Sequence, residues 1–187
     1  MRRAPGPRGV RGRERAGGFA LLAALLVGSC GVGAAPASEP AAVPSAASSL
    51  TPAISATAAL LRTALGTAGF QLSTPQVPFR PAESPTLAAA PRGVFQVKLP
   101  ADEEHGFLVV YELPTPAAAT AAAQEQVAYV ESGPGRVQFP TDARFVLRQV
   151  GSTLIFYAWS PSAVTDPRAP QIADALSSVG MGFPIQG

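Results

Sequence analysis

The densest group of ionisable side chains in this chain of 187 residues is the run Asp102-Glu103-Glu104-His105, which contains the only histidine. Carboxylate oxygens and an imidazole nitrogen bind divalent cations and act as general acids and bases. One interpretation is therefore a metal-dependent enzyme that uses this acidic loop with His105. The other is a solvated loop whose charges keep a hairpin tip soluble. Consecutive residues in a short loop do not converge easily on one ion, and no second histidine completes a zinc site, so we predict no metal site.

Nucleophilic and phosphate chemistry lack a recognisable motif in this sequence. It contains no G-x-S-x-G elbow, and Gly151-Ser152 is typical of a two-residue hairpin turn. Gly133-Pro134-Gly135-Arg136 fits neither a P-loop nor a dinucleotide fingerprint, and its proline has no N–H for an anion, so it indicates a turn before a strand. We predict no catalytic residues and no cofactor, which is to say a protein that is not an enzyme.

Aromatic side chains near the C-terminal end offer a different chemistry, which is ligand binding. In an extended strand, alternation sends Phe156 to one face and Tyr157 with Trp159 to the other. If the helices leave that second face uncovered, Tyr157 and Trp159 form an apolar patch that can receive a partner, and they are our candidate ligand-binding residues. The competing interpretation is that Tyr157 and Trp159 are ordinary packing residues that lie under a long connection over residues 74–92.

The first 30 residues have the features of a targeting signal. Six arginines between positions 2 and 15 precede an apolar run, Phe19 to Val27, that is far shorter than the roughly 20 residues needed to span a hydrocarbon core. A basic segment, a short apolar segment and small residues in this order indicate a cleaved signal peptide over residues 1–29. The segment closes with Val27-Gly28-Ser29-Cys30, and Cys30 is the only cysteine in the chain.

These last four residues resemble the lipobox of bacterial lipoproteins, in which an aliphatic and two small residues precede a modified cysteine. The resemblance covers residues 1–30. It implies that diacylglycerol alkylates the Cys30 thiol, that the Ser29–Cys30 bond is cleaved, and that acyl chains such as palmitate on Cys30 hold the protein at an extracytoplasmic membrane surface. Gly31 stands where an aspartate tends to retain such proteins at the inner membrane, so the resemblance implies the outer membrane if the organism has one.

Charge argues against nucleic acid as a partner. Residues 1–29 contain six arginines against Glu14, a net +5, whereas the rest of the chain has seven arginines and Lys98 against eleven carboxylates, a net −3. The arginines after Cys30 are scattered and form no basic stripe of the kind that a phosphate backbone requires. The basic character of the whole chain therefore belongs to the signal, and we predict no nucleic-acid binding.

The composition divides the chain after the signal into two parts. Residues 30–50 are the lipidated cysteine and a flexible tether of alanine, proline and serine, which cannot bury enough apolar surface to fold. Residues 51–187 are long enough for a single globular domain. Its first predicted helix runs from Pro52 to Ala68, with Thr51 as N-cap and Gly69 as the stop, and a short edge strand follows over residues 70–73.

Two stretches of the domain repeat the same order of elements. Alternating residues predict strands over 94–99 and 107–113, joined as a hairpin by a polar loop, and then a helix that begins at Pro116. Strands over 145–150 and 153–159 and a helix after Asp166-Pro167 follow, with one more strand from Arg136 to Phe139. The pattern predicts an α+β fold in which helices pack on one face of an antiparallel sheet of about five or six strands. An arrangement as two strand-hairpin-strand-helix units is left open.

Taken together, these patterns favour a membrane-anchored lipoprotein of the bacterial cell envelope with a non-catalytic binding or interaction domain. The partners left open are an envelope protein, a glycan or a small apolar ligand. The alternatives are the metal-dependent enzyme that uses the acidic loop with His105, and a purely structural surface protein.

Overall fold

The computed structural model describes residues 50–186 of the chain. The predicted signal peptide over residues 1–29, the lipidation and cleavage sites at Ser29 and Cys30, and the tether as far as residue 49 lie outside the described residues. Leu50, the last residue of the predicted tether, is 41% exposed and belongs to no helix or strand.

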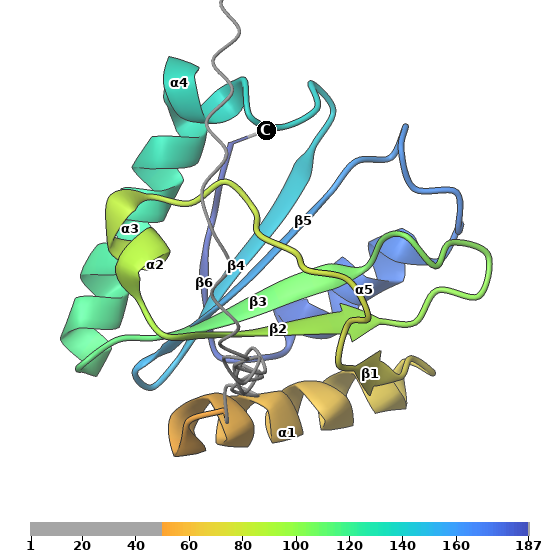
Figure 1. The fold of residues 1–187 in the computed structure, drawn as a ribbon, viewed down its shortest axis with the longest axis horizontal. Coiled ribbons are helices and arrows are strands. Elements are labelled where there is room, and N and C mark those ends of the chain that lie inside the picture. Colours follow the sequence, from red (N-terminus) through yellow and green to blue (C-terminus); the bar gives the residue numbers. More distant parts are fainter. Residues whose placement is uncertain (1–49, 187) are drawn as a thin grey trace, which may run out of the picture. The chain divides into compact units, whose positions relative to one another are not determined.

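Six strands form one antiparallel sheet, which confirms the predicted α+β class (Figure 1). Their order across the sheet is β1-β2-β3-β5-β4-β6. The two predicted hairpins are β2 with β3 and β4 with β5, and β3 joins them by pairing antiparallel with β5. The strand bounds are β1 Leu72–Ser73, β2 Arg92–Val97, β3 Phe107–Glu112, β4 Arg144–Val150, β5 Thr153–Trp159 and β6 Met181–Phe183.

Each of the five described helices has a proline in its first turn, where the missing N–H costs no hydrogen bond. In α1 the Thr51 hydroxyl accepts a hydrogen bond from the Ile54 N–H, and in α3 Thr115 does the same for Ala118. Gly69, at φ +80°, follows α1 as predicted. The helix bounds are α1 Pro52–Thr67, α2 Pro85–Ala89, α3 Pro116–Glu131, α4 Gly133–Arg136 and α5 Ala169–Ser177.

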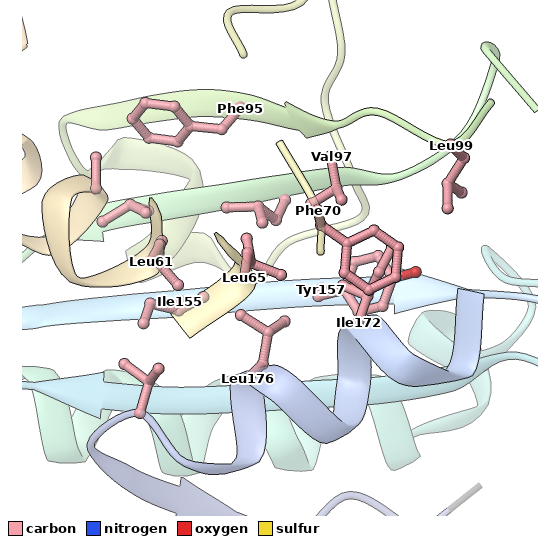
Figure 2. Close-up of a cluster of buried hydrophobic side chains, with 14 of the residues drawn as sticks. Leu61, Leu65, Phe70, Phe95, Val97, Leu99, Ile155, Tyr157, Ile172 and Leu176 are labelled. Atoms are coloured by element: carbon pink, nitrogen blue, oxygen red, sulfur yellow. The ribbon is translucent and has the colours of Figure 1, made fainter. Parts of the chain in front are cut away.

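Helices cover both faces of the sheet, which corrects the expectation of helices on one face. Against the first face pack α1 and α5, with large aliphatic and aromatic side chains between them and the strands (Figure 2). Against the second face pack α2 and the alanines of α3. The physical reason lies in β3, where residues 108–111 are all fully buried, so that neighbouring side chains on both faces of this strand need a cover.

The two strand-hairpin-strand-helix units agree in order but not in position. Because α3 lies on the second face and α5 on the first, one unit does not superimpose on the other by a simple shift along the sheet. The predicted strand from Arg136 to Phe139 is wrong. Ser132 accepts a hydrogen bond from the Gly135 N–H and so caps α4, a single helical turn, in place of a strand. The short elements α2 and β6 were not predicted.

The connection from β1 to α2 crosses the second face over β2 and β3 (Figure 1). The Phe79 ring stacks on Phe107 with 4.5 Å between the ring centroids. The buried Glu83 carboxylate accepts hydrogen bonds from the Tyr111 hydroxyl at 2.7 Å and from Arg92 Nη1 at 3.1 Å. This connection thus replaces a helix as the cover for the outer strands. None of the helices within residues 50–186 has the length and hydropathy needed to cross a membrane.

Candidate functional site

The acidic loop between β2 and β3 does not gather its four ionisable groups at one point. Asp102 turns inward and is 8% exposed, and its Oδ1 lies 2.7 Å from His105 Nδ1. Glu103 and Glu104 are exposed. Within residues 50–186 no group of three or more histidine, cysteine, aspartate and glutamate side chains is placed to hold a metal ion.

Asp102 instead joins the hairpin loop to the connection that precedes α5. Its Oδ2 accepts a hydrogen bond from the Thr165 N–H at 2.7 Å, and in return Asp166 Oδ2 accepts one from the Ala101 N–H at 3.2 Å. The Thr165 hydroxyl also donates to the Ala101 carbonyl at 2.9 Å. We call these three bonds the loop clasp. It links segments that are more than 60 residues apart in the sequence.

The electrostatics of the clasp favour ionised aspartates. Burial alone would raise the pKa of Asp102, but the hydrogen bonds from His105 and from the Thr165 N–H more than offset it, so this pKa is below its ordinary value. The Arg168 N–H lowers the pKa of Asp166, and against the opposing effect of burial the Ala101 N–H and the Arg168 side chain lower it further. Both carboxylates are therefore charged acceptors at neutral pH.

Tyr157 and Trp159 do not form the exposed patch that was one of our two interpretations. Tyr157 is 1% exposed and lies in the core under α1 and α5, among Leu65, Phe70 and Ile172 (Figure 2), and Trp159 packs against the same core. The second interpretation needs correction as well, because the long connection covers the opposite face of the sheet. Burial, and next the negative charge of Asp102, raise the pKa of Tyr157 far above its ordinary range.

Both candidate residues keep one unusual property. The Tyr157 hydroxyl and the Trp159 Nε1–H are buried and have no hydrogen-bond partner among the described residues. A buried donor without an acceptor is costly. Neither Tyr157 nor Trp159 lines the groove at the β1 edge of the sheet, so their unpaired donors do not belong to that candidate site.

A groove of about 640 Å³ lies at the β1 edge of the sheet and was not predicted from the sequence. Three segments line it, namely residues 69–77, residues 96–103 and Arg168. We call it the edge groove. The register of β1 with β2 places Leu72 opposite Val97, so the polar side chains that flank these two residues share the other face. Those polar lining residues are Gln71, Ser73, Gln96 and Lys98.

Two cations and one carboxylate line the edge groove. Lys98, the only lysine in the chain, forms no ion pair within the described residues. The Arg168 guanidinium carbon lies 5.2 Å from the centre of the Phe70 ring. Glu103 supplies the negative charge. The lining holds no histidine, and its Ser73 hydroxyl donates to the Gln96 carbonyl at 3.2 Å.

The loop clasp positions one wall of this groove. Leu99, Pro100 and Glu103 lie on one side of the clasp and Arg168 on the other, so the bonds of Asp102 and Asp166 fix the lining residues relative to each other. The polar alternation of Gln96 and Lys98 in the sequence is the signal that could have pointed to the groove. Comparisons of the chain with protein-family models, with curated proteins and with solved structures found no match.

Proposed function

We propose that this protein is a lipoprotein of the bacterial cell envelope, anchored through acyl chains on Cys30, whose domain binds a hydrophilic ligand in the edge groove without chemically changing it. The anchor rests on the residues around Cys30 and their resemblance to a lipobox. The binding function rests on the groove. The polar lining favours a hydrophilic ligand over the small apolar ligand that the aromatic residues of β5 suggested.

The observation that carries the proposal is the convergence of polar side chains from three segments on one concavity. Ligand sites in proteins are concave, have volumes of roughly 300–1,000 Å³ and present a few well-placed polar groups. The edge groove, at about 640 Å³, lies within this range and presents amide, hydroxyl and cationic groups.

The chain's single imidazole supports binding over catalysis. His105 Nδ1 is bonded to Asp102, and His105 does not line the groove, so the imidazole is not placed to act as a general base on a ligand bound there. A metal-dependent enzyme that uses the acidic loop would instead carry a stoichiometric ion. Elemental analysis of the protein purified from its native host distinguishes the two, because bound metal that is lost on replacement of His105 and Glu104 would support the enzyme.

Photo-crosslinking in native membranes tests the groove directly. We would replace Gln76, an exposed lining residue, with a photoreactive amino acid, and make the same replacement at Arg62 on the exposed side of α1 as a control. The proposal expects an adduct of defined mass at position 76 and none at position 62. Equal labelling at both positions, or none at either, would contradict a ligand site in the groove.

The anchor has its own test. The intact mass of the protein from its native host should correspond to a chain that starts at Cys30 and carries acyl groups. Cys30→Ser should abolish both the cleavage and the acylation. A mature protein with an unmodified Cys30 thiol, or with another first residue, would rule out the anchor while leaving the groove untouched.

A further inference from the structure

We infer that the edge groove recognises an anionic group, a phosphate or a carboxylate on a hydrophilic small molecule or lipid head group, through Arg168 together with Lys98. This inference rests on the proposed binding function and adds the chemical class of the ligand.

Arg168 is held in place before any ligand arrives. Its guanidinium lies over the Phe70 ring, and its Nε is 3.4 Å from Asp166 Oδ1. The backbone N–H of Arg168 bonds the same oxygen at 2.9 Å. Phe70 is 4% exposed and Asp166 is 4% exposed, so both supports belong to the protein interior. The flexible part of the side chain is thereby restrained, which reduces the entropy lost on binding.

The two η nitrogens of this guanidinium remain available. They form no hydrogen bond with any described residue, and the side chain is 38% exposed, so the fork reaches solvent at the groove. A guanidinium fork matches the spacing of two oxygens of a carboxylate or phosphate and binds them in parallel. Asp166 engages only Nε, and it also accepts from the Ala101 N–H, so it compensates the charge without occupying the fork.

Lys98 adds a second cation to the same groove, while Glu103 opposes an anion. The groove therefore suits a ligand with a single anionic group and a hydroxylated body, the latter facing the amide and hydroxyl groups of Gln71, Ser73 and Gln76. Removal of the Glu103 charge should strengthen binding of an anion, whereas a groove that selects a cation would show the opposite response.

Three probes that share one small hydroxylated body test the class of ligand. We would measure equilibrium binding of radiolabelled glycerol 3-phosphate, glycerate and glycerol to the full-length lipidated protein in phosphatidylcholine vesicles. We expect saturable binding of at least one anion and none of glycerol at the same concentrations. Arg168→Gln should weaken that binding about 10- to 100-fold, the range of a lost charge-assisted hydrogen bond.

Further variants keep the test independent of folding. Lys98→Gln alters an exposed side chain without a partner and should weaken binding several-fold, while Glu103→Gln should strengthen it. Arg62→Gln, at an exposed arginine of α1, is the matched control and should change nothing. Binding of glycerol as strong as that of the anions, or anion binding unchanged in both Arg168→Gln and Lys98→Gln, would overturn the inference.

A lipid arm identifies the source of the anion. If phosphatidylglycerol in the vesicles competes with the soluble probe, the natural ligand is a lipid head group, and if it does not, the ligand is a soluble anion. Both results support the inference. A photo-adduct at position 76 without anion binding would refute the anionic class and leave the proposed function standing, whereas loss of both results would refute the two together.

Discussion

The two hairpins of the sheet follow the same order of elements but close in different ways. Between β4 and β5 the chain turns within two residues, Gly151 and Ser152, and the Ser152 carbonyl accepts a hydrogen bond from the Leu113 N–H at the end of β3. Between β2 and β3 a longer loop depends on Thr165 and Asp166, which lie more than 60 residues away. The tight turn only reverses the chain, whereas the long loop forms a wall of the edge groove. The two-residue turn between β4 and β5 therefore contributes to the fold, whereas the β2–β3 loop, which is held by residues distant in the sequence, contributes to a candidate site.

The helices that follow the two hairpins differ as well. α5 faces the core with Ile172 and Leu176, both fully buried, and lies on the face of the sheet where it contacts α1. α3 presents Ala119 and Ala123 to the opposite face. Small side chains allow a helix to approach the sheet closely, while large ones fill a wider space between layers. Four substitutions test these contrasts.

Leu176→Ala should have the largest effect. The side chain is fully buried between α5, α1 and the sheet, so its truncation removes apolar burial and leaves a cavity, at a cost of about 2–5 kcal/mol of unfolding free energy. Urea denaturation at neutral pH measures this loss. Leu60→Ala, at a leucine that is 51% exposed on α1, should cost less than about 0.5 kcal/mol. Similar losses for the two variants would mean that α5 does not pack as described.

Gly106→Ala should be more costly than Gly151→Ala, although both glycines follow the same backbone rule. Each has a positive φ, +85° and +57° respectively, which costs an alanine about 1–2 kcal/mol. At Gly106 a Cβ would also lie 2.4 Å from the Val97 carbonyl oxygen, whereas at Gly151 it would meet no atom within 4 Å. We expect a loss above about 2 kcal/mol for the first variant. Equal losses in thermal unfolding would contradict the close approach at the long loop.

Ala123→Leu tests the close packing of α3 from the other direction. The alanine is fully buried against the sheet, so three extra heavy atoms force the helix outward at a cost of about 1–3 kcal/mol. Ala121→Leu, two residues earlier on the exposed side of the helix, is the matched control and should be nearly neutral. A stabilised Ala123→Leu variant would indicate unfilled space under α3.

The sequence predicted the parts of this molecule that depend on near neighbours. Alternation identified both hairpins, and the threonine-proline pairs identified the starts of α1 and α3. The apolar run at residues 108–111 contained the signal for a strand that is covered on both faces. The residues at the two ends of this strand, however, fit an alternation of apolar and polar side chains, which suggests a strand with one covered face. For the edge groove the sequence held only a partial signal, the polar alternation of Gln96 and Lys98, because its lining unites residues 69–77, 96–103 and Arg168, which no local pattern connects. Likewise, nothing near Asp102 in the sequence indicates that a residue at position 165 will bury it.

Lowering the pH should destabilise the long loop between β2 and β3 before the tight turn between β4 and β5. Of the four substitutions, the one that tests this response should have the smallest effect on stability at neutral pH. Asp102 and Asp166 have pKa values lowered in the folded protein, below the 3.8 that is ordinary for aspartate. The unfolded chain therefore takes up these protons first, so the stabilisation is complete above the ordinary value and is lost as the pH falls through the lowered ones. Asp102→Asn removes one of the two titrating groups of the loop clasp and should make the unfolding free energy fall less steeply between pH 5 and about pH 2. Glu104→Gln, at an exposed neighbour, should keep the original slope, and an unchanged slope in Asp102→Asn would mean that the clasp carries no part of the acid response.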